Sequence, residues 1–295
     1  MPSPDRDEIQ VAETVSSVRE AVRHAKLAGL QVGFVPTMGA LHVGHISLIK
    51  RARAECGYVA VSIFVNPTQF GPNEDFNRYP RPREADLRMC QDVGADLVFY
   101  PSVETMYPVG HTTFVEVAGL SDTLEGAIRP GHFRGVTTVV TKLFNIVQAD
   151  RAYFGQKDFQ QQSIIRVMAR ELDMPTEVIT CETIRDPDGL ALSSRNAYLS
   201  KSERMAGLAL SRALRLAESM VAEGGQDILQ IESAMQQELE TTSGVKLEYA
   251  VIVNYETLKK LTVVEPLMVA LVAARVGTTR LIDNMILRLP GGTNS

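Results

Sequence analysis

Residues 31–66 read QVGFVPTMGALHVGHISLIKRARAECGYVAVSIFVN, and this stretch predicts the fold. The apolar segment 31–37 is typical of a buried strand, and residues 45–56 carry apolar side chains at near-helical spacing. The next apolar run, residues 58–66, is rich in β-branched side chains, which favours a central parallel strand buried on both faces. The stretch therefore predicts a strand–helix–strand unit of a parallel sheet.

The same alternation continues to about residue 184. Strands alternating with helices imply a parallel sheet, so we expect an α/β, Rossmann-like domain over residues 1–184. Its further helices are expected at 13–29, 83–94, 135–148 and 159–172, and its further strands at 96–102, 151–154 and 176–184.

The pattern changes after residue 184, where helices are followed by strands. A polar, turn-rich segment leads to Ser200 and Glu203, which form a capping-box signature at the start of a long helix. We expect a smaller α+β domain over residues 185–295, with helices at 203–224 and 227–242 and strands at 246–254, 267–277 and 279–287.

The composition limits the class of protein. The chain has 295 residues, of which 45% are hydrophobic and 22% charged, and these are ordinary globular values. A net charge of −5 disfavours a nucleic-acid partner. The three cysteines, Cys56, Cys90 and Cys181, are far apart and odd in number, which disfavours a disulfide framework. No signal peptide and no membrane span is seen in the sequence, so we expect a cytoplasmic protein without a membrane partner.

The loop between the first buried strand and its helix is the first candidate site. It reads PTMGALHVGH over residues 36–45 and contains His42 and His45. Ligands bind beyond the carboxyl ends of parallel strands, and a helix N-terminus attracts anions, so two imidazoles there suit a phosphate. The alternatives are a zinc site, for which HxxH lacks further ligands, and a structural loop with both histidines satisfied locally.

Three further polar segments are candidate sites, each with a purely structural alternative. Asn66 and Gln69 follow the second buried strand and suit an organic substrate, or form an ordinary Asx-turn. Lys157 lies beside Gly155 in a strand-to-helix turn, one helical turn before Gln161, and suits a polyphosphate or is a surface lysine. The segment 189–196, GLALSSRN, offers two hydroxyls and a guanidinium for a triphosphate, or is a serine-rich linker.

Together these segments resemble the pantoate–β-alanine ligase (pantothenate synthetase) family. "HVGH" is similar to the HxGH signature of the wider nucleotidyltransferase superfamily, and "LSSR" to its KMSKS-type counterpart. The remaining motifs span almost the whole chain in the expected order: SIFVNPTQF (62–70), GHFRGV (131–136), FGQKDFQQ (154–161), GLALSSRN (189–196) and VAARVGTTRLIDN (272–284).

The resemblance implies a reaction and a set of site residues. The implied enzyme condenses (R)-pantoate with β-alanine in an ATP-dependent reaction that passes through pantoyl adenylate and releases pyrophosphate and AMP. His45, as proton donor, His42 and Lys157 are the implied catalytic residues, Gln69 and Gln161 hold pantoate, and Gln69 also lies near β-alanine. The implied ATP site comprises Met38, Gly39, Ala40, Leu41, His42, Val43, Gly44, His45, Gly155, Gln156, Lys157, Asp158, Ile184, Leu192, Ser193, Ser194 and Arg195.

The resemblance also implies Mg²⁺, a homodimer and a C-terminal domain that covers the site. Asp86 is a possible metal ligand, or phosphates and water hold the ion. One departure from the family pattern is Gln156, which stands where the family commonly has glutamate. The rival functions are a nucleotidyltransferase that stops at a nucleotide-linked product, an aminoacyl-tRNA synthetase, and a nucleotide-binding sensor or scaffold without turnover.

Overall fold

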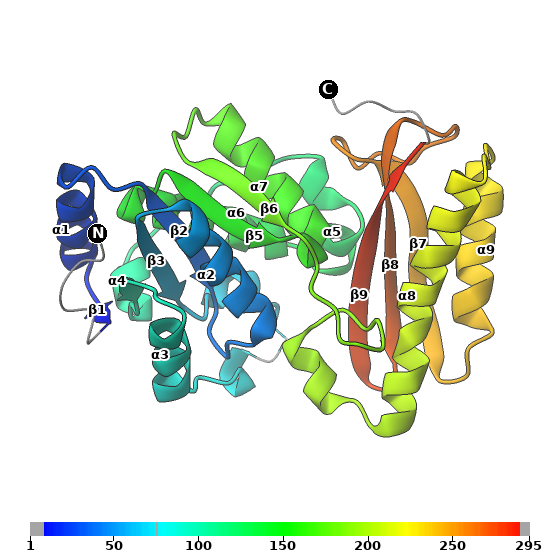
Figure 1. Ribbon diagram of the computed structural model, residues 1–295, viewed down its shortest axis with the longest axis horizontal. Coiled ribbons are helices and arrows are strands. Elements are labelled where there is room, and N and C mark those ends of the chain that lie inside the picture. Colours follow the sequence, from blue (N-terminus) through cyan, green and yellow to red (C-terminus); the bar gives the residue numbers. More distant parts are fainter. Residues whose placement is uncertain (1–8, 73, 75, 290–295) are drawn as a thin grey trace. The chain divides into compact units, whose positions relative to one another are not determined.

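The computed structural model describes residues 9–72, 74 and 76–289 (Figure 1). Contacts divide the chain into two compact units, of which one runs to Gly155 and includes Gln160–Glu182. The other comprises Gln156–Phe159 and the chain from Thr183 onward. The limits 1–184 and 185–295 stay a prediction, because the first eight residues lie outside the described ones and the four-residue segment 156–159 groups with the second unit.

The first unit is built on a six-stranded sheet in which every neighbouring pair is parallel, as the alternation in the sequence predicted. The strand order is β1-β4-β3-β2-β5-β6, so the α/β class is confirmed. The strands are β1 (Gln10–Ala12), β2 (Val32–Thr37), β3 (Tyr58–Ile63), β4 (Leu97–Phe99), β5 (Arg151–Gly155) and β6 (Glu177–Cys181).

Helices cover both faces of this sheet, because consecutive strand residues point to opposite sides. Phe34 packs in a core with helices α1, α6 and α7, whereas its neighbour Val35 packs with α2 and α3. The helices are α1 (Val15–Leu27), α2 (Val43–Glu55), α3 (Arg83–Asp92), α4 (Val103–Met106), α5 (Glu125–Ile128), α6 (His132–Val147) and α7 (Phe159–Glu171).

Several elements differ from the sequence prediction. The strands expected at 96–102 and 176–184 end at Phe99 and Cys181, and the four-residue helices α4 and α5 were not predicted. The run 58–66 is a strand only to Ile63, because Pro67 and the Asn66 side chain, which accepts from the Thr68 N–H, start the short 3₁₀ helix η1 (Pro67–Gln69). Strand β1 was not predicted, since three residues give no alternation to recognise.

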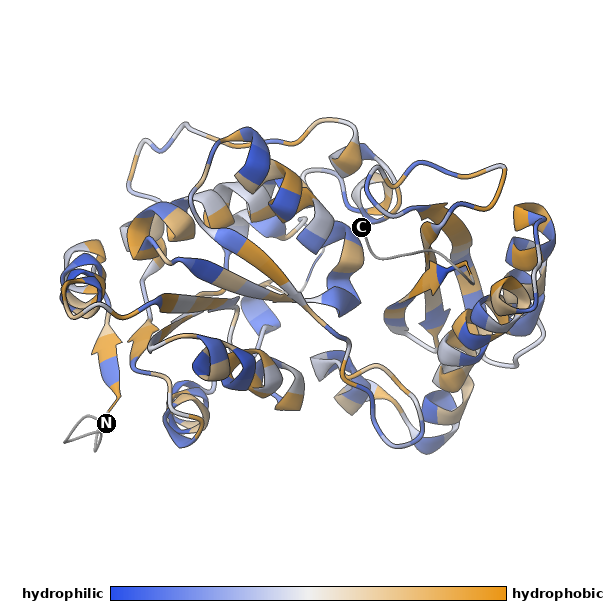
Figure 2. Ribbon diagram, turned by 45° about the horizontal axis from the view of Figure 1, so that its top comes forward, coloured by the Kyte–Doolittle hydropathy of each residue, from blue (hydrophilic) through white to orange (hydrophobic). Residues whose placement is uncertain are grey.

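The second unit is a three-stranded antiparallel sheet with the order β7-β8-β9. Its core joins α8 and α9 to the sheet, and Figure 2 shows the strands mostly coloured as apolar and both helices as mixed. The capping box predicted at Ser200 and Glu203 is present at the start of α8. The elements are α8 (Lys201–Ala222), α9 (Ile228–Glu240), β7 (Val245–Asn254), β8 (Leu267–Val276) and β9 (Thr279–Arg288).

None of the helices in the described ranges combines the length and the apolar character that crossing a bilayer requires.

Candidate active site

The loop after β2 is held by one buried carboxylate. Both oxygens of Asp86, which is 2% exposed, accept main-chain hydrogen bonds, from the N–H of Ala40 at 2.9 Å and of Leu41 at 2.8 Å. Gly39 has φ +81°, and a Cβ there would lie 2.9 Å from both Asp86 Oδ2 and a methyl of Ile63. The loop conformation therefore requires glycine at position 39 and an acceptor at position 86.

The two histidines of this loop cap the helix that follows it. His42 is the N-cap of α2, and its Nδ1 accepts from the Gly44 N–H at 3.1 Å. His45 Nδ1 accepts from the His42 N–H at 3.4 Å, and the two ring centroids lie 4.2 Å apart. Because each Nδ1 accepts, each neutral ring carries its proton on Nε2, which makes Nε2 the donor.

These contacts change the expected way in which the loop binds an anion. The N–H groups of Ala40, Leu41, His42 and Gly44 are already engaged by side chains of the protein. The predicted contact with phosphate would then use the imidazole Nε2 groups rather than these main-chain N–H groups. The structural alternative and the phosphate-binding alternative are therefore compatible, since the rings cap the helix through Nδ1 and the prediction uses Nε2.

Asp86, named as a possible magnesium ligand from the sequence, is engaged within the fold. Its two oxygens point at main-chain N–H groups, and among the described residues no three His, Cys, Asp or Glu side chains are grouped to hold a metal. The same finding leaves the zinc alternative for His42 and His45 without further ligands among those residues.

The turn after β3 brings Gln69 to the first loop. Gln69 Nε2 lies 3.0 Å from the sulfur of Met38, and Gln69 Oε1 accepts from Asn66 Nδ2 at 3.0 Å. Asn66 is 1% exposed and is used within the fold, since its Oδ1 accepts from Thr68 and from the Tyr107 hydroxyl. The Asx-turn alternative thus holds for Asn66, while Gln69 is placed beside the loop proposed for the nucleotide.

Helix α6 supports this turn through residues to which sequence reasoning assigned no role. A Cβ on Gly135 would lie 2.3 Å from the main-chain oxygen of Thr68, so only glycine lets α6 approach so closely. His132 Nδ1 lies 2.8 Å from the main-chain oxygen of Gln69, and Arg129 contacts the same oxygen at 3.4 Å. The GHFRGV motif was the available signal, but its pattern does not say which turn it contacts.

Arg129 is itself fixed by a carboxylate. It forms an ion pair with Glu74 at 2.6 Å. Burial raises the pKa of the Glu74 carboxyl, but the hydrogen bond and charge of Arg129 and the Gly71 N–H outweigh it, so the pKa is lowered. Glu74 is therefore ionised at neutral pH and holds Arg129 below the Gln69 turn.

Gln161 lies on α7 between two glutamines that serve the fold. Gln160 bonds Glu125, Leu120 and Thr123, and Gln162 bonds Ser163 and Thr180. Within the described ranges, the half-buried Gln161 side chain makes no hydrogen bond. Among the three, it is the side chain available to a ligand.

A cavity of about 180 Å³ lies beside Met38 and Gly39, at the carboxyl ends of β2, β3 and β4. This is the edge at which open parallel sheets bind ligands. Of the other residues that line the cavity, only Asp86 was named from the sequence. The rest are Ile63, Phe64, Val65, Phe76, Arg81, Tyr100, Pro101, Ser102 and Val103.

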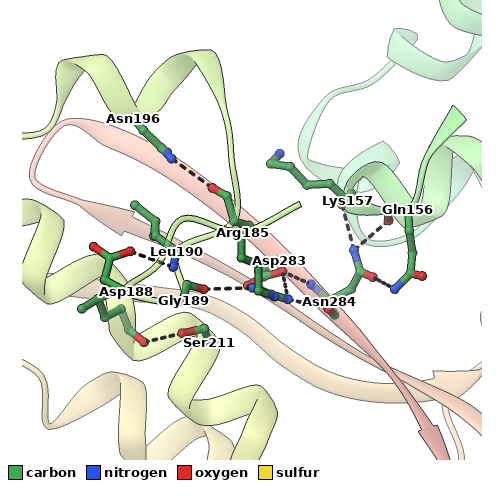
Figure 3. A network of polar contacts seen from close by, with 12 residues as sticks. Gln156, Lys157, Arg185, Asp188, Gly189, Leu190, Asn196, Ser211, Asp283 and Asn284 are labelled. Carbon is green, nitrogen blue, oxygen red and sulfur yellow. Dashed lines mark hydrogen bonds and ion pairs between the residues drawn. The ribbon is translucent and has the colours of Figure 1, made fainter. Parts of the chain in front are cut away.

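Apart from Gly155, which ends the first stretch of the first unit, the remaining candidate residues belong to the second unit. Gly155 ends β5, and Gln156, Lys157 and Asp158 form the 3₁₀ turn η4, in which the Lys157 ammonium lies 3.9 Å from an Asp158 oxygen. The Lys157 side chain is 18% exposed, and its main-chain oxygen accepts from Asn284 (Figure 3).

The segment 184–196 folds as a short hairpin followed by a 3₁₀ helix. The Leu192 N–H donates to the Ile184 oxygen at 2.9 Å, which brings these two predicted residues together. Ser193 caps η5 (Ser194–Tyr198) by accepting from the Arg195 N–H at 3.3 Å, and the Ser194 and Arg195 side chains are exposed. The serine-rich segment is therefore an ordered turn rather than a linker.

The chain was compared with known proteins. Residues 10–286 match the model of a family described as pantoate–β-alanine ligase. A pantothenate synthetase of Moorella thermoacetica is 50% identical over 281 residues, covering 95% of this chain and 99% of that protein. One of Acidobacterium capsulatum is 53% identical over 287 residues, covering 94% and 96%.

Solved structures agree with these relatives. A pantothenate synthetase of Thermus thermophilus superposes with a TM-score of 0.89 at 46% identity, covering 94% of this chain and 99% of that one. The Francisella tularensis pantoate–β-alanine ligase, complexed with beta-gamma ATP and β-alanine, gives a TM-score of 0.76 at 35% identity, covering 94% and 97%. The chain belongs to the pantoate–β-alanine ligase family.

Proposed function

We propose that this chain makes pantothenate in two steps, through a pantoyl-adenylate intermediate, at the carboxyl edge of the β2–β3 sheet region. The observation that carries the proposal is the contact between Gln69 and Met38, at 3.0 Å. It places the glutamine proposed for pantoate against the loop proposed for ATP, as attack of a carboxylate on a phosphate requires. The Francisella relative, complexed with beta-gamma ATP and β-alanine, supports both ligands for this chain.

In the first step, a pantoate carboxylate oxygen attacks the α-phosphorus of ATP and pyrophosphate leaves. Both reactants are anions, so donors and cations must offset their repulsion and stabilise the charge that develops on the leaving pyrophosphate. His42 and His45 supply Nε2 donors, with His45 giving the proton, and Lys157 and Arg195 supply positive charge. Gln69 and Gln161 hold pantoate through amide groups that both donate and accept.

In the second step, the β-alanine amine attacks the acyl carbon of the adenylate, and AMP leaves. Gln69 serves this step too, since the turn that carries it is fixed by Asn66 and His132. We assign to ATP the remaining residues around these groups: Met38, Gly39, Ala40, Leu41, Val43, Gly44, Gly155, Gln156, Asp158, Ile184, Leu192, Ser193 and Ser194.

We further propose that Mg²⁺ enters with ATP and is held by phosphate oxygens and water, as this ion often is. The described carboxylates do not form a cluster for it, so the steps above use only the protein's own groups. A homodimer in the cytoplasm is the proposed state, on the basis of the family resemblance.

One experiment separates this function from a nucleotidyltransferase and from a nucleotide-binding sensor. The protein is mixed with ATP, Mg²⁺ and pantoate, and pyrophosphate is followed by rapid quench before and after β-alanine is added. We expect one equivalent of pyrophosphate per site, then turnover with AMP formation once β-alanine is present. The absence of pyrophosphate at every pantoate concentration would overturn the proposal.

A further inference from the structure

Two neighbouring polar residues are buried on β9 of the second unit. Asp283 is 4% exposed and Asn284 is 2% exposed, although they lie in a strand packed against an apolar core. Buried polar side chains are costly unless every group finds a partner. Both belong to the LIDN motif, to which the function proposed above assigns no task.

The Asn284 side chain finds all of its hydrogen-bond partners on the turn that carries Lys157. Its Nδ2 donates to the main-chain oxygens of Gln156, at 2.9 Å, and Lys157, at 2.8 Å. Its Oδ1 accepts from the Gln156 side-chain amide at 3.1 Å. One buried side chain thus fixes two successive peptide groups of η4 and the side chain of Gln156.

Asp283 and Arg185 in turn fix the strand and the neighbouring hairpin. Arg185 donates to both oxygens of Asp283, at 2.6 and 2.9 Å, and also to the main-chain oxygen of Asn284 at 3.3 Å. Arg185 reaches the main-chain oxygen of Gly189 as well, at 3.2 Å. The hairpin that leads to Ser193–Arg195 is therefore tied to the same two residues of β9 (Figure 3).

Lys157 is held by its main chain, while its side chain extends away from Asn284 (Figure 3). Among the described residues, the one ionic partner of its ammonium is Asp158 of the same turn, at 3.9 Å, which is too long for a tight ion pair. The point from which the Lys157 side chain extends is set by the backbone at residues 156 and 157, and Asn284 fixes that backbone.

We propose that Asn284 is a positioning residue for the adenylation step, acting through Lys157. It holds the η4 backbone so that the Lys157 ammonium is already placed for the ATP phosphates. The proposal rests on the role of Lys157 in the proposed function. Preorganised charge avoids reorganisation during the reaction, and a displacement of about 1 Å can cost on the order of 10²-fold in rate.

An amide is the group that this site requires. Two carbonyl oxygens need a donor, which an amide nitrogen supplies and a carboxylate does not. Gln156 completes the arrangement because its amide donates to Asn284 Oδ1, whereas a glutamate at this position has no proton to donate when ionised.

The test is a double-mutant cycle of Asn284→Ala and Lys157→Ala, read as the single-turnover rate of pyrophosphate release and the KM for ATP. Asn284→Ala alone is expected to lower the rate by about 10- to 100-fold. In the Lys157→Ala background the same substitution is expected to lower it by less than about 3-fold, since residues that act as one unit are not additive.

Two further variants keep the outcome interpretable. Glu248→Gln removes a charge that holds Arg275 and Arg280, the latter on β9, and is the control for general damage to this sheet. It should leave the rate unchanged. If Asn284→Ala does not give a folded circular dichroism spectrum, Asn284→Ser, which keeps one hydroxyl donor for the two carbonyl oxygens, replaces it in the cycle.

Fully multiplicative effects of the Asn284 and Lys157 substitutions would overturn the inference while leaving the proposed function intact. A Lys157→Ala enzyme with the normal rate would overturn both the inference and the role of Lys157. The proposed adenylation would still stand in that case, because the pyrophosphate burst would persist unchanged.

Discussion

Two turns proposed to contact ATP are each held by one buried side chain. Asp86 accepts hydrogen bonds from the first turn, whereas Asn284 donates hydrogen bonds to the second. The loop Met38–His42 turns its N–H groups inward onto the carboxylate of Asp86, whereas the turn Gln156–Asp158 turns its carbonyl oxygens inward onto the amide of Asn284. Asp86 is 46 residues from Ala40, while Asn284 is 128 residues from Gln156.

The difference teaches how each turn presents itself to an anion. At the first loop, Asp86 takes up the N–H groups of Ala40 and Leu41, so the side chains of His42 and His45 are the donors proposed for phosphate. At the second turn, Asn284 takes up the acceptors, which would repel phosphate, and leaves the Lys157 ammonium as the group presented. Asp86 and Asn284 thus determine which groups of each turn face inward and which are proposed to contact the ligand.

The largest effect should come from the donors of the first loop. We expect His45→Ala to slow adenylate formation by about 10²- to 10³-fold, because one preorganised donor to the leaving group is lost. Rapid-quench assay of pyrophosphate measures this, and His24→Ala, an exposed histidine on α1, is the control. A near-normal rate would remove His45 from the mechanism and make the first loop only structural.

The second-largest effect should come from replacing Asp86, the carboxylate that holds the first loop, with an amide. Asp86→Asn places an amide N–H against the N–H of Ala40 or Leu41, so we expect a loss of about 1–3 kcal/mol in the free energy of unfolding. Urea denaturation measures this loss. An Asp86→Asn protein with wild-type stability would show that the first loop does not depend on the Asp86 carboxylate, unlike the second turn, which is proposed to depend on Asn284.

A smaller effect is expected where the first loop meets the Gln69 turn. Gly135→Ala would press a methyl group onto the Thr68 carbonyl, so α6 must shift, and overpacking typically costs about 1–3 kcal/mol before relaxation. We expect the lower end of that range and a raised KM for pantoate, measured by thermal unfolding and steady-state kinetics. Gly71→Ala is the matched control, because its new Cβ would lie 3.7 Å from the nearest atom. Equal behaviour of the two variants would contradict the close approach of α6.

The smallest effect is a pH-dependent one at Glu74. Because its pKa is lowered in the folded state, its contribution to stability is present above the ordinary pKa of 4.5 and is lost as the pH falls through the lower folded value. We therefore expect Glu74→Gln to lower Tm by a few degrees at pH 7, and this difference to shrink as the pH falls below 4.5. A difference that grew toward low pH would contradict the sign of the shift.

The sequence predicted the parts of the fold that depend on local pattern. Apolar runs and helical spacing placed the elements from β2 to β9 except the four-residue helices α4 and α5. The position of each polar loop after a strand placed His42, Gln69 and Lys157 beyond the carboxyl ends of β2, β3 and β5. The three-residue β1 and the true end of β3 at Ile63 escaped this reasoning, because one is too short for a pattern and the other depends on an Asn–Pro turn.

The two buried side chains that hold these turns, Asp86 and Asn284, could not be predicted from local patterns. A buried aspartate on α3 looked like a possible metal ligand, and only the folded loop shows that its oxygens face Ala40 and Leu41. The contact of Asn284 with the turn at Gln156 depends on how β9 packs, and no local spacing encodes a contact across 128 residues. Glycine is likewise required at position 135 because the Thr68 carbonyl, which is distant in sequence, leaves no room for a Cβ.

The central claim, that pantoate is activated as an adenylate, is tested most directly by the fate of its carboxylate oxygens. Pantoate labelled with ¹⁸O in the carboxylate is turned over with ATP and β-alanine, and the nucleotide product is analysed by mass spectrometry. We predict that AMP carries one ¹⁸O atom per turnover, because a carboxylate oxygen attacks the α-phosphorus and leaves with it. Unlabelled AMP, or ADP with label in orthophosphate, would contradict the account.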